Sequence, residues 1–458
     1  MSPVGATTVG RESTVGGKNA SAALAIRWLF PELDGRLTVL DKKRIVLGRE
    51  GDVDVLLPGE ETSRRHAELQ IEGLLVRIRD LGSRNGIHVG GKRVDEAHLA
   101  IGTVLRLGEW VGVLVAASRE DLEDAEPFQP LLPGYFGGPI LRSTMAPLRK
   151  AAHSNLPVIV EGETGSGKEG VARAVHAWSD RPGPFVAVNC AALPETLAEG
   201  ELFGYRRGAF TGAERANPGH LRAAHTGTLF LDEIADLSPV LQPKLLRALE
   251  QHEVVPLGES VPVRVDVRIV AAVQAPLREA VEAKRFRGDL FARLDGVTVR
   301  LPPLRARVEE VPFLFMSLLA KGLAGRPRPV VDSALIERLC LYDWPFNVRE
   351  LDLVTRQLLA LHGDQKKLVR SMLPSRLLET SSAAGRAPFT PAASVVVPSP
   401  DLETLLSVLR NHGGNLSRAA AALGISRQKA YRLMEGAPRA TAPDSSDDGL
   451  SARKIPSA

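Results

Sequence analysis

The sequence predicts a multidomain protein with an N-terminal β-sandwich, a central α/β domain that carries a helical lid, and a small all-α domain. Short β-type runs separated by turn residues fill the first quarter of the chain. Apolar strands then alternate with helical segments, and a segment near the C-terminus has helical periodicity interrupted by glycines. The 458 residues are enough for about three domains of roughly 100–200 residues each.

The composition is typical of a globular protein, with 44% hydrophobic and 24% charged residues. The sequence has no run of 18 apolar residues, and the apolar stretch at 22–30 is interrupted by Arg27 and lacks a signal-peptide cleavage site. We therefore expect a cytoplasmic protein with no membrane partner. Cys190 and Cys340 lie far apart in apolar surroundings, which predicts buried thiols and no disulfide. The net charge of +4 permits nucleic-acid binding without indicating it.

Residues 1–23 are rich in Gly, Ser, Thr and Val without periodicity and are predicted to be a disordered leader. Residues 24–116 hold short strand-like runs separated by Gly, Asp, Asn and Pro, which is typical of a β-sandwich. The runs are Leu37–Leu40, Arg44–Leu47, Ala67–Ile71, Leu75–Arg79, Val104–Leu107 and Val111–Val115.

Three short blocks in this region suit a phosphate dianion, because they combine arginine forks with short hydrogen-bond donors. They are Gly48-Arg49, Ser63-Arg64-Arg65-His66 and Gly82-Ser83-Arg84-Asn85-Gly86. The arginines alone would equally fit a solvated basic rim; the Ser-Arg-x-His and Asn-Gly blocks favour a binding site.

In these blocks the region resembles the forkhead-associated (FHA) domain, a β-sandwich that binds phosphothreonine peptides through loops at one end. The resemblance implies that Gly48 and His66 are structural and that Ile87 stands where the family usually has Thr. It implies a phosphothreonine site made of Arg49, Ser63, Arg64 and Asn85, with Arg84 nearby.

Residues 117–137 are acidic and rich in Pro and Gly, which predicts a linker; we expect the α/β domain at 138–300 and its helical lid at 301–380. The apolar run Leu156–Val160 leads into a glycine-rich loop and then a helical segment to Trp178, the context that a phosphate-binding loop requires. Backbone N–H groups of Gly165–Lys168 would hold the β-phosphate of ATP, and Lys168 would reach the β- and γ-oxygens. The predicted ATP-binding loop is Gly162, Glu163, Thr164, Gly165, Ser166, Gly167, Lys168 and Glu169.

A second apolar run, Leu229–Leu231, ends in Asp232 and Glu233, as in a Walker B strand. Asp232 would orient Mg²⁺ and Glu233 would polarise the attacking water. Because Glu169 replaces the usual Ser or Thr after the lysine, Mg²⁺ would depend on Asp232 and water. The alternative for the acidic pair is that it caps the following helix.

Between these motifs lies the loop Gly208, Ala209, Phe210, Thr211, Gly212 and Ala213. Its two glycines allow a sharp bend. Phe210 places one large apolar side chain at the tip, which is costly in water unless a partner covers it.

Residues 139–362 resemble the AAA+ domain of bacterial enhancer-binding proteins, the activators of sigma-54 RNA polymerase. The resemblance is carried by FVAVNCAAL (185–193), ELFGYRRGAFTGA (201–213), GTLFLDEIADLSPVLQPKLLRALE (227–250), FRGDLFARL (286–294), RLPPLRAR (300–307) and WPFNVREL (344–351). It implies that Asn189 holds Glu233 when the bound nucleotide requires it, and that Arg349 in the lid senses nucleotide. It also implies that Arg287 and Arg293 reach the neighbouring subunit's γ-phosphate in a homo-oligomer, from a dimer to a hexameric ring, and that Phe210 and Thr211 contact sigma-54.

Two positions depart from that family. Ala272-Val273-Gln274 replaces Ala-Thr-Asn, which leaves Gln274 as the predicted ATP-binding residue at the strand end and puts the link from γ-phosphate to the loop in doubt. Phe346 replaces a glycine in the turn that positions Arg349. For Arg287 and Arg293, ordinary surface salt bridges remain the alternative.

Near the C-terminus, residues 381–400 are predicted to be a linker and 437–458 a disordered tail. Between them, three helical segments at 401–411, 416–423 and 427–435 are separated by glycine-containing turns, with Ser426 as N-cap of the last. The segment resembles the Fis-type helix-turn-helix, and a helical dimerisation module is the alternative. The expected contacts with enhancer DNA come from Arg418, Ser426, Arg427, Gln428, Lys429, Tyr431 and Arg432.

The sequence therefore predicts an ATPase that needs ATP and Mg²⁺, binds enhancer DNA and remodels the sigma-54 RNA polymerase holoenzyme under phosphothreonine control. Two other classes stay open: a DNA-binding regulator or phosphopeptide adaptor with a vestigial ATPase, and an AAA+ remodeller of another protein.

Overall fold

The computed structural model describes residues 23–379 except 74, 119–120, 123–127 and 129. The chain divides into two units, 1–397 and 398–458, and the second lies outside the described residues. The predicted leader up to residue 22, the linker at 381–400, the helix-turn-helix with its DNA-binding residues and the C-terminal tail are therefore not described. Among the described residues, no helix is long and apolar enough to cross a bilayer.

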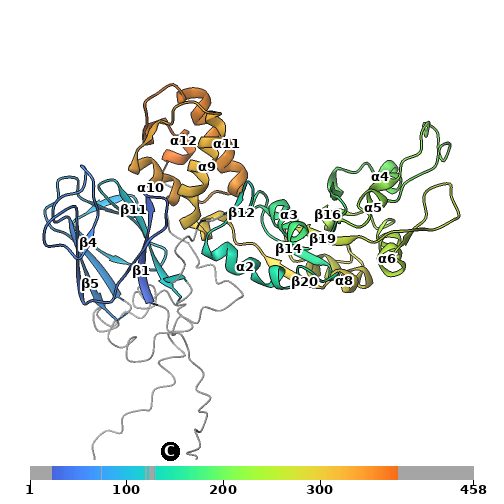
Figure 1. Cartoon of the computed structure of the whole chain (residues 1–458), viewed down its shortest axis with the longest axis horizontal. Helices are drawn as coiled ribbons and strands as arrows, with labels where there is room; N and C mark the ends of the chain where they lie inside the picture. The colour runs from blue at the N-terminus through green and yellow to red at the C-terminus, as the bar shows by residue number, and fades with distance from the viewer. Residues whose placement is uncertain (1–22, 74, 119–120, 123–127, 129, 380–458) are drawn as a thin grey trace, which may run out of the picture. The chain divides into compact units, whose positions relative to one another are not determined.

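The N-terminal region is a sandwich of two sheets with strand orders β2-β1-β11-β10-β7-β8 and β4-β3-β5-β6-β9 (Figure 1). Between them lies an apolar core in which the rings of Trp28 and Trp110 meet edge to face, 5.7 Å apart. The strands are β1 (Ala23–Phe30), β2 (Leu37–Val39), β3 (Arg44–Gly48), β4 (Val55–Leu56), β5 (Ala67–Glu72), β6 (Leu75–Asp80), β7 (Ile87–Val89), β8 (Lys92–Val94), β9 (Glu96–Leu99), β10 (Val104–Leu107) and β11 (Trp110–Ala117).

The predicted β-sandwich is confirmed, and each of the six predicted runs lies in a strand. The sequence did not predict β1, whose residues are almost continuously apolar because both of its faces are buried. Strands β4, β7, β8 and β9 have two to four residues each, too few to show alternation.

The central domain is a parallel sheet of order β15-β16-β19-β14-β20, as predicted. Helices α2 and α3 share an apolar cluster with one face of the sheet, and helices α4 to α8 share a second cluster with the other face. The sheet strands are β14 (Val158–Glu161), β15 (Phe185–Asn189), β16 (Thr228–Asp232), β19 (Arg268–Val273) and β20 (Val297–Arg300). The other elements are α2 (Pro139–Lys150), α3 (Lys168–Trp178), η1 (Cys190–Ala192), α4 (Glu195–Phe203), α5 (Gly219–Ala223), η2 (Ile234–Asp236), α6 (Gln242–Gln251), β17 (Glu253–Val254), β18 (Val263–Arg264), α7 (Leu277–Glu282) and α8 (Gly288–Leu294).

The lid is helical, with α9 and α11 packed together and α10 beside α9. Its elements are η3 (Leu304–Ala306), η4 (Val308–Glu310), α9 (Val311–Leu323), β21 (Val330–Val331), α10 (Ser333–Leu341), α11 (Asn347–His362), β22 (Lys367–Leu368), η5 (Arg370–Met372) and α12 (Ser375–Leu378). Both cysteines are buried, as predicted: Cys340 lies in the lid core and Cys190 against the sheet. Burial raises the pKa of the Cys190 thiol to about 12.

The predicted linker at 117–137 differs in its second half, where β12 (Pro130–Leu132) and β13 (Tyr135–Phe136) form a hairpin. Leu131, Leu132 and Tyr135 pack against the cluster that holds α3. A Cβ on Gly170 would lie 2.3 Å from the Tyr135 ring, so the helix can approach the hairpin only through a glycine. The linker was predicted from the acidic, Pro- and Gly-rich composition of the whole segment, which gave no weight to these few apolar side chains.

Candidate nucleotide and phosphopeptide sites

The glycine-rich loop joins β14 to the start of α3, so the predicted strand–loop–helix arrangement is present. Gly165 and Gly167 have φ of +74° and +106°, a backbone conformation that favours glycine. Lys168, only 7% exposed, donates from Nζ to the Gly162 carbonyl at 2.9 Å. Ser166 is buried, and its Oγ has no hydrogen-bond partner among the described residues. A buried hydroxyl, an ammonium group and a helix N-terminus directed at one place fit a polyphosphate such as that of ATP.

The acidic pair follows β16, next to the glycine-rich loop. Asp232 ends the strand, and its Oδ1 accepts the Glu233 N–H at 3.1 Å. Burial, and next the neighbouring Glu233 charge, raise the pKa of Asp232. Glu233 Oε1 lies 3.5 Å from Lys168 Nζ, and the Glu233 side chain does not cap η2. These contacts favour the Mg²⁺ and water-activating assignments over a helix cap.

Glu233 is held by Gln274 in this structure. The Gln274 amide donates from Nε2 to Glu233 Oε1 at 3.0 Å, from the end of β19. Asn189 is aligned with Asp232 across β15 and β16, but its Oδ1 accepts the Ala191 N–H at 3.0 Å and caps η1. The residue expected only to bind ATP therefore contacts the glutamate, while the residue expected to hold the glutamate supports a turn.

The lid is bonded directly to the glycine-rich loop. Arg305 forms a bidentate pair with Glu163, with N–O distances of 2.8 and 2.6 Å, and lowers the pKa of that carboxyl. Asn347 donates to Glu163 Oε2 and to the Thr164 carbonyl, at 3.2 and 3.0 Å. Arg349 also lies against the loop, because a Cβ on Gly165 would come within 2.9 Å of the Arg349 Cβ.

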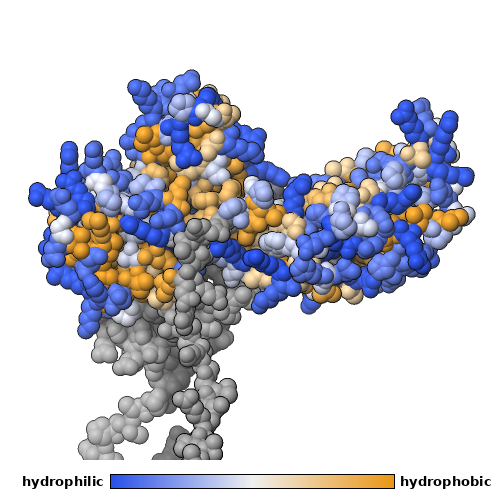
Figure 2. All heavy atoms as spheres, viewed as in Figure 1, coloured by the Kyte–Doolittle hydropathy of each residue, from blue (hydrophilic) through white to orange (hydrophobic). Residues whose placement is uncertain are grey.

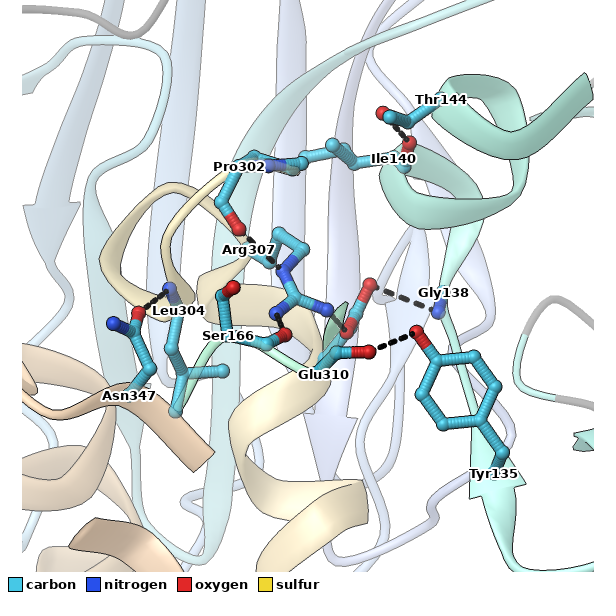
Figure 3. Close-up of polar contacts among 11 residues, drawn as sticks. Tyr135, Gly138, Ile140, Thr144, Ser166, Pro302, Leu304, Arg307, Glu310 and Asn347 are labelled. Atoms are coloured by element: carbon cyan, nitrogen blue, oxygen red, sulfur yellow. Dashed lines mark hydrogen bonds and ion pairs between the residues drawn. The ribbon is translucent and has the colours of Figure 1, made fainter. Parts of the chain in front are cut away.

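A buried arginine, Arg307, connects the lid with the loop and with the start of α2 (Figure 3). Its guanidinium donates to the Ser166 carbonyl at 3.1 Å and to Glu310 Oε2 at 2.8 Å. Glu310 Oε1 accepts the Gly138 N–H at 2.9 Å, and the Tyr135 hydroxyl lies 3.4 Å from the Gly167 carbonyl. Tyr135, Gly138, Arg307 and Glu310 were not predicted as part of the site, although Arg307 lies in the segment RLPPLRAR that carries the family resemblance.

The two arginines predicted to act in trans, one at the N-cap of α8 and one within α8, make contacts within this chain. Arg287 pairs with Asp289 at 2.6 Å and Arg293 donates to the Leu249 carbonyl at 2.9 Å. Both arginines lie on the surface of this single chain. Their role across a subunit boundary stays a prediction.

The loop at 208–213 forms a tight turn in which the Gly208 N–H donates to the Ala213 carbonyl at 2.8 Å. Gly208 and Gly212 have φ of +79° and +99°, so the expected sharp bend is present. Phe210 packs edge to face against Tyr205 yet remains 38% exposed. Figure 2 shows apolar patches on an otherwise largely hydrophilic surface; the exposed large apolar side chains of the central domain include Phe210, Val240, Val255 and Val261.

The loops of the sandwich bring the predicted phosphothreonine residues together. The Ser63 carbonyl accepts the Arg49 N–H at 3.1 Å, and Ser63 Oγ accepts the Arg84 N–H at 3.0 Å. Asn85 Nδ2 donates to the Glu61 carbonyl at 2.7 Å, and Arg64 points its guanidinium toward solvent with 78% of its side chain exposed.

Gly48 and His66 support these loops. A Cβ on Gly48 would lie 1.9 Å from the Arg64 carbonyl oxygen, so no other residue fits. His66 is fully buried between the Ser63 N–H and the Gly86 carbonyl, and burial lowers its pKa. No group of His, Cys, Asp and Glu able to hold a metal ion by itself occurs in the described part of the chain.

Known protein families match all three described regions. Residues 137–300 match the sigma-54 interaction domain, residues 305–388 the AAA+ ATPase lid domain, and residues 45–108 the FHA domain. The C4-dicarboxylate transport transcriptional regulatory protein DctD of Rhizobium meliloti is 39% identical over 331 residues, which cover 70% of this chain and 68% of that protein. The chain belongs to the family of transcriptional regulators with a sigma-54 interaction domain.

Other members of this regulator family align over the same part. The Nif-specific regulatory protein of Azotobacter vinelandii is 42% identical, covering 64% of this chain and 57% of that protein. ZraR of Klebsiella oxytoca is 41% identical, covering 63% of this chain and 66% of that protein. The chain thus spans 57–66% of the length of these two relatives. NtrX of Brucella abortus, solved in complex with ATP, is 31% identical with a TM-score of 0.48, covering 65% of this chain and 67% of that one.

These matches confirm the predicted AAA+ ATPase module with its lid and the predicted FHA domain. They do not test the roles of single residues, so the site assignments above rest on geometry.

Proposed function

We propose that this sigma-54 regulator is an ATP-dependent activator that remodels the sigma-54 RNA polymerase holoenzyme, bound to enhancer DNA and controlled by phosphothreonine recognition. The observation that carries the proposal is the placement of Lys168, Asp232, Glu233 and Gln274 at one edge of the sheet, inside a module that matches the sigma-54 interaction domain.

Hydrolysis of ATP needs a held polyphosphate, a cation and an activated water. Lys168 and the N–H groups of the loop hold the phosphates. Asp232 would hold Mg²⁺, which neutralises charge on the phosphate oxygens when bound. Glu233 accepts the proton of the attacking water, and Gln274 fixes the direction of that carboxylate.

The output of the cycle is the loop at 208–213. Phe210 and Thr211 contact sigma-54, and the exposed apolar ring of Phe210 is covered in that contact. Arg287 and Arg293 complete the site of the neighbouring subunit, so hydrolysis waits for assembly of the homo-oligomer. An arginine supplied in this way is worth on the order of 10³–10⁵ in rate.

The input is a phosphothreonine protein bound by Arg49, Ser63, Arg64, Arg84 and Asn85. Enhancer binding is assigned to residues 401–436, which lie outside the described residues. Arg418, Ser426 and the polar residues of the last helix would contact the DNA, as a dimer on paired half-sites.

Transcription in vitro from a sigma-54 promoter tests the output, with Thr211→Ala compared with wild type. We expect ATP turnover to be retained and transcription to be lost. Thr298→Ala on β20, another exposed threonine, is the matched control and should leave both unchanged. Transcription that is unaffected by Thr211→Ala would favour remodelling of another protein, and absent turnover at concentrations where the chain assembles would favour a vestigial ATPase.

Peptide binding tests the input. Arg49→Ala and Ser63→Ala should each weaken binding of a phosphothreonine peptide by about ten-fold or more, since hydrogen bonds to a charged group contribute about 1.5–3 kcal/mol. The control is Arg77→Ala, because Arg77 pairs with Glu96 on a strand surface away from these loops. Equal affinity of all variants would refute the phosphothreonine site.

A further inference from the structure

One face of the FHA sandwich is buried against the AAA+ lid. Side chains of β1, β10 and β11 belong to the same apolar cluster as the core of α9 and α10. The sandwich contributes Leu29, Phe30, Val104, Val111 and Val113, and the lid contributes Phe315, Leu319, Leu335, Ile336 and Leu339 among others. A cluster of this kind forms one hydrophobic core, so part of the lid core is supplied by the FHA domain.

Three polar contacts cross the same surface. Arg106 Nε donates to Glu337 Oε2 at 2.8 Å, and the Glu337 side chain is only 2% exposed. Ser333 Oγ, at the start of α10, donates to the Gly108 carbonyl at 3.0 Å, and Arg27 Nε lies 3.4 Å from Glu309 Oε2. Buried polar groups need hydrogen-bonding or ionic partners, and the partners here come from different domains.

On the FHA side, the turn between β10 and β11 also supports the phosphothreonine loop. The Glu109 carboxylate accepts the Glu61 N–H at 3.0 Å and the Thr62 hydroxyl at 3.2 Å. Asn85, one of the predicted phosphothreonine ligands, donates to the Glu61 carbonyl at 2.7 Å. A Cβ on Gly108 would lie 2.6 Å from the Glu61 carbonyl, so the loop lies directly on the turn whose carbonyl Ser333 binds.

On the ATPase side, the segment that Arg27 contacts also reaches the nucleotide loop. Glu309, the partner of Arg27, is followed by Glu310, which bonds Arg307. Arg307 in turn donates to the Ser166 carbonyl in the glycine-rich loop (Figure 3). The phosphothreonine loops are thus connected to α10 through Ser333, and η4, which packs beside α10, is connected to the phosphate-binding loop through Arg307.

We propose that the FHA–lid interface couples the two ligand sites, so that phosphothreonine binding changes nucleotide affinity through the lid. The proposal rests on the proposed phosphothreonine recognition. A phosphopeptide that engages Asn85 and Ser63 competes with the contacts that hold the 61–63 loop on the Gly108 turn, and the packed interface passes that change to α10 and η4. Coupling of this kind is reciprocal: each ligand changes the affinity of the other by the same factor.

The experiment uses the full chain, a fluorescent ADP analogue and a phosphothreonine peptide selected on the wild-type protein. In the wild type, saturating peptide should change the dissociation constant of the ADP analogue by about five-fold or more, and saturating ADP should change the peptide constant by the same factor. In Arg106→Ala and in the milder Ser333→Ala, both factors should fall below about two-fold. Arg77→Ala, which removes an ion pair outside the interface, should keep the wild-type factor.

A second measurement needs no peptide. Hydrogen exchange at residues 162–168 and the affinity for the ADP analogue should change in Arg106→Ala and Ser333→Ala, but not in Arg77→Ala. A peptide that fails to bind the wild type would refute phosphothreonine recognition. The second measurement would then still show whether the FHA–lid interface affects the nucleotide loop. Unchanged exchange and affinity in both interface variants, or a peptide effect that survives in them, would overturn the inference.

Discussion

The glycine-rich loop and the phosphothreonine loops both collect donors for phosphate oxygens, but their side chains differ in burial. At the proposed nucleotide site, Ser166 and Lys168 are 2% and 7% exposed. At the sandwich loops, the Arg49 and Arg64 side chains are 40% and 78% exposed. Arg49 and Arg64 each lie 3.7 Å from Glu50, an exposed carboxylate that a phosphate can displace.

The difference indicates what each site depends on. The glycine-rich loop of the proposed nucleotide site is bonded to the lid by Arg305, Arg307 and Asn347. The loops of the proposed phosphothreonine site receive support from within the sandwich, from His66. Substitutions outside the ligand set should therefore damage the first site more than the second.

The largest effect is expected for Glu233→Gln, which keeps the shape of the side chain but removes the proton acceptor. We expect kcat for ATP hydrolysis to fall by about 10²–10⁴ with little change in nucleotide affinity, the usual contribution of a general base. Steady-state turnover and binding of a nucleotide analogue measure the two quantities. Glu282→Gln is the control, because Glu282 is an exposed carboxylate at the end of α7 and is not among the residues assigned to the nucleotide site. Equal losses in both variants would exclude the assigned role.

The next largest effect distinguishes a supporting residue, Arg307, from a proposed phosphate ligand, Arg64. Arg307→Ala leaves the buried Glu310 carboxylate without its partner and should lower the free energy of unfolding by about 3–5 kcal/mol. Arg64→Ala removes an exposed side chain and should change that free energy by less than about 0.5 kcal/mol, while weakening phosphopeptide binding. Denaturant unfolding gives both numbers. Similar destabilisation by the two substitutions would remove the contrast between the sites.

Segments that carry a short sequence motif could be located from the sequence alone. The structure has the glycine-rich loop between a strand and a helix, the Asp232-Glu233 pair at a strand end, and the three blocks at 48–49, 63–66 and 82–86 in neighbouring loops, as the sequence predicts. The roles of these residues stay predictions. The alternation of strands and helices in the central domain, and the apolar cluster on each face of its sheet, follow from the periodic pattern of apolar residues.

Contacts between segments that are distant in the sequence could not be predicted from local motifs. Arg307 and Glu310 are separated from Ser166 by more than a hundred residues, and no local pattern links them. The same holds for Arg106 with Glu337, and for the hairpin at Tyr135, which composition alone marked as a linker. Asn189 and Gln274 both lie at strand ends, so the sequence could not decide which amide reaches Glu233.

A smaller effect concerns Glu309, the carboxylate that meets Arg27 across the FHA–lid interface. Burial raises its pKa from 4.5 to about 7, an effect opposed by Arg27 and increased by Glu310 and Asp121. The folded state therefore holds this proton more tightly than the unfolded state. The resulting stability is complete below about pH 4.5 and is lost as the pH rises through about 7.

Glu309→Gln removes this titration. From pH 5 to pH 8, wild-type stability should fall relative to Glu309→Gln by on the order of 2 kcal/mol. Denaturant unfolding across this pH range in matched buffers gives the difference, and parallel curves for the two proteins would contradict the assigned protonation.

The smallest effect, and the one that tests the departure from the family pattern, is expected for Gln274→Ala. The Gln274 amide is the group that holds Glu233, at 3.0 Å, whereas the Asn189 amide oxygen is occupied by the Ala191 N–H. Losing one hydrogen bond to a charged group should lower kcat about ten-fold and leave KM within about two-fold.

Asn189→Ala should lower kcat less than Gln274→Ala, because its amide bonds to a turn and not to the glutamate. Gln357→Ala on the exposed side of α11 should have no effect and serves as the control. A larger loss in Asn189→Ala would mean that Glu233 changes its partner during turnover, with Gln274 holding it in only one part of the cycle. Either ranking identifies the amide that controls the glutamate when water attacks, and so decides whether the extra methylene of Gln274 preserves the link between γ-phosphate and the loop at 208–213.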